Sequence, residues 1–181
     1  MNAGQALWFL DILRGNYLDL ARQKDPEFMP LEVLEPYERH GSFPSSLLTA
    51  AWFGRQGGIV SVWSLWEVYS TTICTPLPNQ VKRKRGESHV EWVGRTLTAN
   101  SWQFACQDWF EGGNALRNLI THHHCRVRGQ RATDLMAEAR RHAFPQLTAA
   151  PNDYVNLESD HVSEYFWKIA EFIRDPGQPD T

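Results

Sequence analysis

The chain has 181 residues, of which 42% are hydrophobic and 22% charged, and it carries a formal net charge of -3 with an isoelectric point of about 6.2. This length and composition predict a single folded domain and exclude extensive disorder. The slightly acidic balance also excludes a polycation that holds nucleic acid through its overall charge. Any such contact would depend on local clusters of arginine or lysine.

The spacing of apolar residues predicts six helices in chain order, over residues 4–23, 47–75, 89–110, 114–127, 131–143 and 159–174. Four prolines within residues 25–45 indicate an irregular connection before the second helix, which Ser45 or Ser46 would cap. The pair Gly57–Gly58 predicts an irregularity inside the second helix, and Gly112–Gly113 predicts the break between the third and the fourth.

The chain shows no alternating strand pattern of useful length, no internal repeat and no domain-sized linker. We therefore expect an all-α fold, a helical bundle of about five or six helices. It should form one domain over residues 1–175, followed by a flexible tail over residues 176–181.

The cysteines and the hydropathy of the chain indicate the cellular compartment in which the protein resides. The three cysteines are odd in number and widely spaced, which argues against a disulfide scaffold and favours a reducing compartment. The N-terminus lacks the basic segment of a signal peptide, and the apolar run over residues 59–73 is too short and too polar for a membrane span. These features predict a cytoplasmic protein without a membrane partner.

The segment Leu116–His122 places Arg117, Asn118 and His122 within an apolar helical pattern. Histidine transfers protons near neutral pH, and arginine is permanently charged and suits a phosphate whose negative charge grows in a transition state. Arginine and histidine together can cut RNA without a metal. This group is therefore the candidate for a catalytic site.

Helix geometry complicates this candidate. On an ideal helix Arg117 shares a face with Thr121 and His124, whereas His122 shares a face with Asn118. Arg117 and His122 can converge only if the helix distorts, if the long arginine reaches round, or if two copies meet about a two-fold axis. The helical phase therefore leaves His124 as an alternative to His122.

The pattern Arg-Asn-x-x-x-His on a helix resembles the Arg-x4-6-His motif of HEPN domains, which are helical bundles found in prokaryotic toxins, abortive-infection proteins and CRISPR effectors. The long helix around Val62–Tyr69 looks like the second helix of that bundle, with Glu67 near its middle. The resemblance covers residues 47–128, the HEPN-like core.

The resemblance implies a homodimeric, metal-independent endoribonuclease with the motif at the dimer interface. It would act as a toxin or as a defence or stress effector, need no cofactor, and be controlled by an antitoxin protein. His122 would act as general acid or base while the 2'-hydroxyl of RNA attacks the adjacent phosphate. Arg117 would hold that phosphate, Asn118 would orient the histidine or bind phosphate, and Glu67 would pair with Arg117.

Two arginines beyond the motif, Arg126 and Arg128, would extend the phosphate-binding track.

The basic run Lys82–Arg85 lies in a polar loop over residues 79–88. It could bind RNA or an acidic partner, but we interpret it as a solvated loop. Adjacent histidines on a helix point in different directions, so His122–His124 do not predict a metal site.

Two other functions remain open from the sequence. A non-catalytic HEPN-like module would bind RNA, a nucleotide or a protein in an open cleft without cleaving it. A helical adaptor unrelated to HEPN domains would use Arg117 in a structural ion pair with carboxylates.

Overall fold

The computed structural model describes residues 1–24, 43–149 and 153–177, together with their side chains except at 16–24, 43–53 and Ser159. The predicted connection over residues 25–42 lies outside the described residues, and so do the side chains of Ser45 and Ser46.

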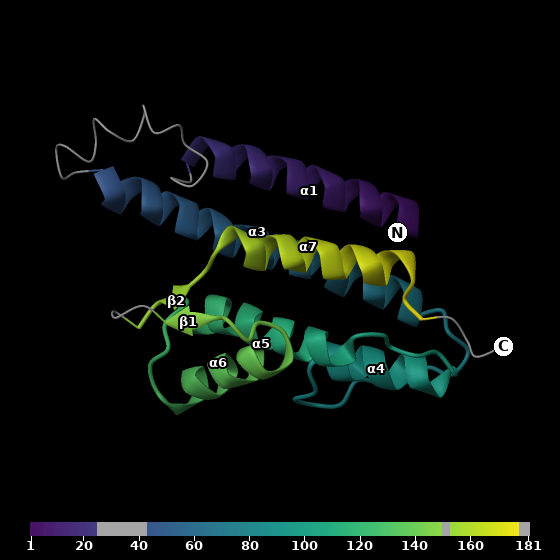
Figure 1. Ribbon diagram of the computed structural model, residues 1–181. Helices are drawn as coiled ribbons and strands as arrows, with labels where there is room; N and C mark the ends of the chain where they lie inside the picture. The colour runs from purple at the N-terminus through teal and green to yellow at the C-terminus, as the bar shows by residue number, and fades with distance from the viewer. Residues whose placement is uncertain (25–42, 150–152, 178–181) are drawn as a thin grey trace.

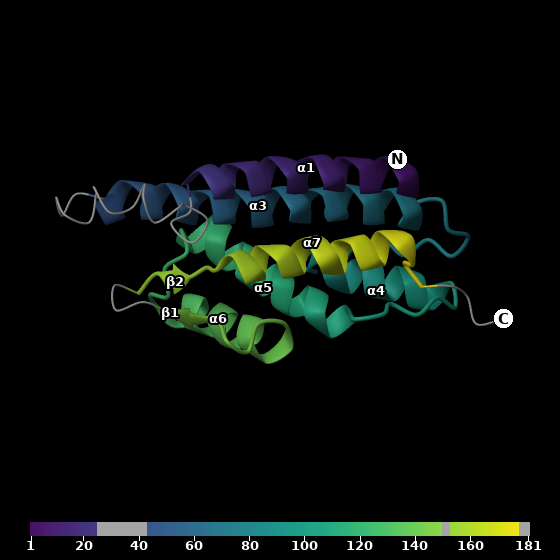
Figure 2. The same cartoon turned by 45° about the horizontal axis from the view of Figure 1, so that its top comes forward.

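Six helices make up most of the described chain, which confirms the all-α prediction: α1 (Ala3–Lys24), α3 (Phe43–Cys74), α4 (His89–Ala99), α5 (Gln107–His123), α6 (Gln130–His142) and α7 (Ser159–Arg174). Figure 1 shows α1, α3 and α7 side by side along the length of the molecule, with α4, α5 and α6 beneath them. Figure 2 shows the same two layers from a second angle. The bundle is thus two helical layers with the core between them.

Aromatic side chains fill the space between the layers. Trp63 and Trp66 of α3 are fully buried, and their ring centroids lie 4.7 Å apart. The Trp66 ring stacks on Phe110 of α5 at 4.7 Å, and the Trp63 ring meets Tyr165 of α7 edge-on at 6.1 Å. Such pairs contribute about 0.5–1.5 kcal/mol each beyond the area that they bury. This cluster joins α3, α5 and α7.

The predicted single helix over residues 89–110 is wrong. The helix α4 ends at Ala99 and α5 begins at Gln107, so the break lies before the glycine pair. The Asn100 side chain donates to the carbonyl of Thr96 at 2.8 Å and to that of Asn79 at 3.1 Å, in competition with the backbone of a continuing helix. Ser101 and Cys106 then take positive φ values of 60° and 61°, which an α-helix does not permit.

The glycine pair lies inside α5 because it lets the helix pack closely. A Cβ atom at Gly112 would lie 2.8 Å from both the Cβ and the backbone nitrogen of Ala143, just beyond α6. A Cβ atom at Gly113 would lie 3.0 Å from the Trp63 ring, and the Gly113 carbonyl accepts the hydroxyl proton of Tyr165. Likewise α3 runs unbroken through Gly57–Gly58, so that predicted irregularity is also wrong.

The fourth helix was predicted to reach residue 127, and this is wrong as well, because α5 ends at His123. His124 and Cys125 both take left-handed conformations, with φ values of 51° and 60°. The chain then pairs with the segment before α7, where the amide of Val155 donates to the Cys125 carbonyl at 2.9 Å. Next to this contact, β1 (Thr148–Ala149) pairs with β2 (Val155–Asn156) in antiparallel register. Strands this short leave no periodic signal in a sequence.

In the described residues, no helix is both long and apolar enough to cross a bilayer.

We expect Gly112→Ala to lower the free energy of unfolding by about 1–3 kcal/mol, because the added methyl group meets backbone that cannot move aside cheaply. The control is Gly57→Ala in α3, where nothing lies within 4 Å of the added methyl group. That change should raise stability by about 0.5–1 kcal/mol, the difference in helix propensity between the two residues. Urea denaturation followed by circular dichroism measures both. Equal effects of the two substitutions would contradict the close packing at Gly112.

Candidate functional site

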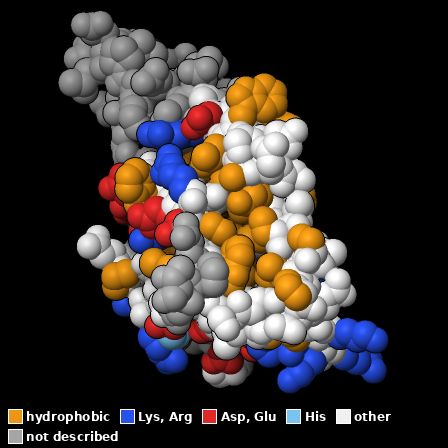
Figure 3. All heavy atoms as spheres, turned by 90° about the vertical axis from the view of Figure 1, so that its right-hand side faces the viewer, with side chains coloured by type: hydrophobic (Ala, Val, Ile, Leu, Met, Phe, Trp, Pro, Cys, Tyr) orange, Lys and Arg blue, Asp and Glu red, His pale blue; other side chains and the backbone are white. Residues whose placement is uncertain are grey.

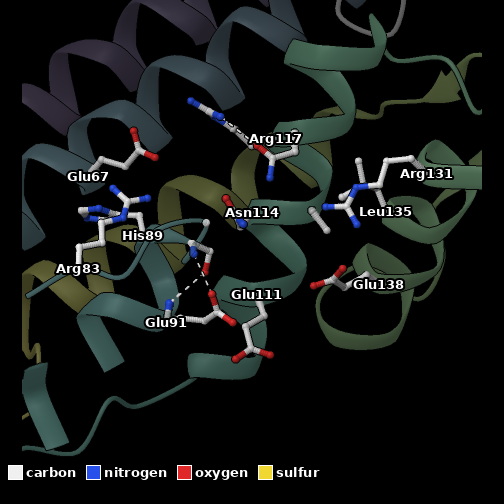
Figure 4. Close-up of a pocket in the computed structure, with 14 residues that line it drawn as sticks. Glu67, Arg83, His89, Glu91, Glu111, Asn114, Arg117, Arg131, Leu135 and Glu138 are labelled. Atoms are coloured by element: carbon white, nitrogen blue, oxygen red, sulfur yellow. Dashed lines mark hydrogen bonds between the residues drawn. The ribbon is translucent and has the colours of Figure 1, made fainter. Parts of the chain in front are cut away.

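A polar cleft of about 450 Å³ has α5 as its floor. One wall is α6, and the opposite wall is the loop over residues 75–88 together with the start of α4. Figure 4 shows Glu67, Arg83 and His89 on one side, Arg131 and Glu138 on the other, and Asn114 between them. The full lining comprises Glu67, Arg83, Gly86, Ser88, His89, Glu91, Glu111, Asn114, Ala115, Arg117, Asn118, Arg131, Leu135 and Glu138. A volume of this size admits a ligand such as a nucleotide.

The side of α5 that forms the floor of the cleft carries a stripe of polar residues. Glu111, Asn114 and Asn118 recur at intervals of three and four residues, which places them on one side of the helix. Leu116 and Leu119 lie on the other side and are fully buried. The buried side attaches α5 to the core and thereby turns the polar stripe toward the cleft.

Arg117 reaches the cleft from the edge of this stripe. Its Nη1 atom donates to Oδ1 of its neighbour Asn118 at 3.0 Å. Its Nε atom is buried and has no hydrogen-bond partner in the described part of the chain. A buried donor without a partner costs about 1–3 kcal/mol, so the described residues do not fully satisfy the Arg117 guanidinium.

The expected pairing of Glu67 with Arg117 is not formed. Both residues line the cleft, but no ion pair joins them among the described residues. The Oε1 atom of Glu67 instead accepts the indole N–H of Trp63 at 3.1 Å, one turn earlier on α3. The Arg117 guanidinium therefore has no carboxylate partner within the described part of the chain.

The cleft is mixed in formal charge, with three arginines and four glutamates in its lining. Three of the glutamates have other partners: Glu67 accepts from Trp63, Glu91 from the backbone of Ser88, and Glu111 from Gln107. These donors are uncharged and do not cancel the carboxylate charges, so three arginines against four glutamates leave the lining with a formal charge of -1. An anion in this cleft would therefore be held by directed hydrogen bonds from guanidinium groups and not by a net positive field.

The three histidines of the motif region do not line the cleft. His122 and His124 are exposed, and His123 is half-buried at the end of α5. His122 lies one helical turn beyond Asn118 and thus on the same side of α5. His124 has left the helix, which removes the phase argument that placed it beside Arg117. Within one copy of the chain the structure joins Arg117 to Asn118 but brings neither histidine into the cleft.

The histidine that does line the cleft is His89, which the sequence analysis missed. It is buried at the first position of α4, and its Nε2 atom lies 2.8 Å from the Ser70 hydroxyl. Burial lowers the pKa of His89 to about 4, and the charge of Arg83 acts in the same direction. The imidazole is therefore neutral at neutral pH. Ser70 is fully buried and cannot reach a substrate, so this pair does not form an exposed nucleophile.

Two other lining arginines, Arg83 and Arg131, were not predicted for this site. They come from the loop before α4 and from the first turn of α6, and only the tertiary fold brings them near Arg117.

A helix-capping signal in the sequence does mark the start of α4, where His89 lies. Ser88 accepts from the amide of Glu91, whose carboxylate accepts from the amide of Ser88.

Arg126 and Arg128 lie outside the cleft lining, and the phosphate track expected of them stays a prediction. The Arg126 guanidinium lies over the Tyr154 ring at 4.5 Å, a cation–π contact. The Nε atom of Arg128 is 2.8 Å from a carboxylate oxygen of Asp153. Both arginines hold the segment before α7 against the end of α5.

One group of side chains beside the cleft has the chemistry to hold a divalent ion. Potential ligand atoms of Asp108, Glu111 and His142 all lie within 4.8 Å of one another. Asp108 and Glu111 are one turn apart on α5, and the contact at Gly112 brings the end of α6 toward them. Exposed carboxylates often lie this close without a metal, and we assign none here.

No family model, no curated protein and no solved structure matches this chain. What the cleft binds must therefore be inferred from its own residues.

The buried His89 should make stability depend on pH. Its pKa is lowered from 6.5 to about 4 in the folded protein, so the unfolded chain binds the proton first as the pH falls. The free energy of unfolding should therefore decrease between pH 6.5 and about pH 4, by up to about 3 kcal/mol from this residue. His161, whose pKa is also lowered by burial, contributes in the same direction.

Urea denaturation at pH 7 and pH 4.5 tests this expectation. His89→Gln keeps a hydrogen-bond donor for Ser70 and removes the titrating ring, so it should flatten part of the dependence. His161→Gln measures the contribution of the second ring. A dependence unchanged by His89→Gln would show that His89 is not held neutral.

Proposed function

We propose that the cleft binds a phosphate group of RNA and that Arg117 is its main contact. The observation that carries this proposal is the Arg117 guanidinium, which faces a polar cleft with a buried, unpartnered Nε atom and no carboxylate partner among the described residues. A guanidinium offers parallel N–H donors that match two phosphate oxygens. Phosphate is thus a ligand that meets both its charge and its geometry.

The same observation argues against the helical adaptor. An adaptor would use Arg117 in an ion pair with carboxylates, as buried arginines of structural networks do. The predicted partner, Glu67, instead accepts the indole N–H of Trp63 on its Oε1 atom. Asn118 fixes one edge of the guanidinium and leaves other donors for a ligand.

Cleavage of the bound RNA is the activity that the resemblance to HEPN domains adds to this proposal. His122 would take the proton of the 2'-hydroxyl, and O2' would form a bond to phosphorus as the bond from phosphorus to O5' breaks. The products are a 2',3'-cyclic phosphate and a 5'-hydroxyl whose proton comes from a second imidazolium or from water. Arg117 would stabilise the phosphate as its charge grows.

This step requires His122 to reach a phosphate held by Arg117. His122 follows Asn118 by one turn on α5, so a strand that runs along this side of the helix would pass both residues. A second copy of the chain about a two-fold axis could also supply the histidine. Toxin-like control by an antitoxin protein belongs to the same proposal and rests on the resemblance alone.

The second candidate is a module that binds RNA without cleaving it. The exposed positions of His122 and His124, outside the cleft lining, favour this alternative. It uses the same contact through Arg117 and lacks only proton transfer, so binding and cleavage must be measured separately.

Binding is measured with a fluorescently labelled 2'-O-methyl oligouridylate, which cannot undergo attack by a 2'-hydroxyl. We expect Arg117→Ala to weaken binding about 10- to 100-fold, the loss of a charge-assisted hydrogen-bonded pair. Arg117→Lys should recover only part of the affinity, because lysine keeps the positive charge but lacks the parallel N–H donors of the guanidinium. Arg174→Ala removes an exposed arginine of α7 outside the cleft and should bind as the wild type does. Wild-type affinity in Arg117→Ala would contradict the proposal.

Cleavage is measured with unmodified RNA in EDTA. If the chain is a nuclease, the wild type should leave 2',3'-cyclic phosphate ends, and His122→Ala should slow the reaction about 10²- to 10⁴-fold. His124→Ala tests the alternative histidine. Binding without any cleavage by the wild type would identify the non-catalytic module. Cleavage that survives Arg117→Ala and both histidine substitutions would place the activity elsewhere and overturn the assignment.

A further inference from the structure

The loop between α3 and α4 presents a run of four basic residues beside the cleft. Arg83 lines the cleft, and the side chains of Lys82, Lys84 and Arg85 are exposed next to it. Figure 3, which faces the end of the molecule where α3 terminates, shows Lys and Arg side chains gathered along its lower edge. We call Lys82–Arg85 the basic loop.

Glu87 holds the basic loop in one conformation. Its carboxylate accepts the amide of Lys84 at 2.7 Å and forms an ion pair with Arg95 of α4, and its carbonyl accepts from Arg83. The hydrogen bond from Arg95 and then that from Lys84 lower the pKa of Glu87 to about 2. The carboxylate therefore stays ionised at all ordinary pH values and remains committed to these partners.

The helix α4 anchors the loop at its other end. The indole N–H of Trp92 donates to the carbonyl of Val81 at 2.8 Å, and Nη2 of Arg95 donates to the carbonyl of Lys82 at 3.1 Å. These bonds hold the backbone, and the side chains of Lys82, Lys84 and Arg85 remain exposed while that of Arg83 is turned to the Glu87 carbonyl. A loop that is already ordered loses less conformational entropy when a ligand binds.

The charges of Lys82, Lys84 and Arg85 have no carboxylate partner in the portion of the chain that the structure describes. Glu87 and Glu91, the acidic residues nearest in sequence, are occupied by backbone amides and by Arg95. The loop thus offers three exposed cations that form no ion pair among the described residues, although the charge of Lys84 also acts on the Glu87 carboxylate. An isolated solvated loop, as the sequence alone suggested, would need neither the anchor at Glu87 nor the one at Trp92.

The size of the cleft limits what it can hold. A volume of about 450 Å³ suits one nucleotide and not a longer strand, so the rest of a polymeric ligand must leave the cleft. The cleft wall formed by Arg83, Gly86 and Ser88 belongs to the same loop, so a strand leaving on this side passes the basic loop. Its phosphates would meet three further cations there.

We propose that the basic loop binds the phosphates of an RNA strand that extends from the cleft, so that the ligand is a polymer and not a free nucleotide. This inference rests on the proposed binding of an RNA phosphate by Arg117. It assigns the two contacts different tasks: Arg117 holds one phosphate inside the cleft, and the basic loop adds affinity only for a strand long enough to reach it.

The test compares the triple variant Lys82→Ala, Lys84→Ala, Arg85→Ala with a matched control that loses the same charge, Arg14→Ala, Arg140→Ala, Arg174→Ala, all exposed residues outside the cleft. The probes are labelled 2'-O-methyl oligouridylate and the 2'-O-methyl uridine dinucleotide, each titrated at several salt concentrations. Each phosphate contact with a single strand contributes about 0.7 to the slope of log affinity against log salt.

We expect the triple variant to lose about 2 from this slope with the oligonucleotide and to bind the dinucleotide as the wild type does. The control should keep the wild-type slope. An unchanged slope in the triple variant, or an equal loss in the control, would overturn the inference. So would loop-dependent binding of polyglutamate, because an acidic protein would then fit the loop as well as RNA does.

The two proposals fail in different ways. If Arg117→Ala lowers the affinity for the dinucleotide while the loop variant keeps its slope, only the inference about the loop is wrong. If the wild type binds neither probe, the proposed function is wrong and the inference falls with it. Equal melting temperatures verify that the variants are folded. Single substitutions, each expected to lower the slope by about 0.7, replace the triple variant if it melts early.

Discussion

The close contact of α5 with the end of α6 at Gly112 and with α3 at Gly113 is the constraint on which the cleft depends. Gly112 leaves room for the backbone at Ala143, and Gly113 leaves room for the ring of Trp63. One side of α5 is thereby pressed against the aromatic core, and its polar stripe becomes the floor of the cleft. A side chain at Gly112 would push α5 away from the end of α6, and one at Gly113 would push it away from α3 in the other layer.

The packing of α5 holds Arg117 in place, and the proposed function depends on this residue. Its helix is held by apolar neighbours, and the arginine is partly covered without receiving a carboxylate partner among the described residues. Most buried guanidinium groups are neutralised by a carboxylate, because an uncompensated charge away from water is costly. A polar cleft in front of an unpaired arginine is therefore better explained by a ligand than by stability. An unpaired arginine supports the proposed phosphate binding more directly than the proposed catalysis.

In the proposed mode of binding, the basic loop and the cleft would make two different kinds of contact with the ligand. Inside the cleft a guanidinium and an amide offer directed hydrogen bonds to one group. Outside it, the exposed cations of the loop act over longer distances and weaken as salt rises. The ion pair between Glu87 and Arg95 links the two, because it fixes the loop on the helix whose first residue, His89, lines the cleft.

Local sequence was sufficient for the helical class and for most of the helices. Apolar spacing determines α1, α6 and α7 to within a residue or two, because an amphipathic stripe is a property of neighbouring residues along the chain. It also singled out Arg117 and Asn118, which do lie together at the cleft. The class of ligand, by contrast, came from the chemistry of an arginine near a histidine and from the resemblance to HEPN domains, and not from apolar spacing.

The tertiary structure decided the features that depend on distant residues. Gly112–Gly113 signals a break in the sequence but lies within a helix, because the space that the missing side chains leave is filled by Ala143 and Trp63. His122 and His124 carry the stronger chemical signal, yet the cleft contains His89, because α5 ends at His123 and α4 turns its first residue inward. Sequence spacing records which residues share a helix, whereas a site between helices depends on how those helices pack.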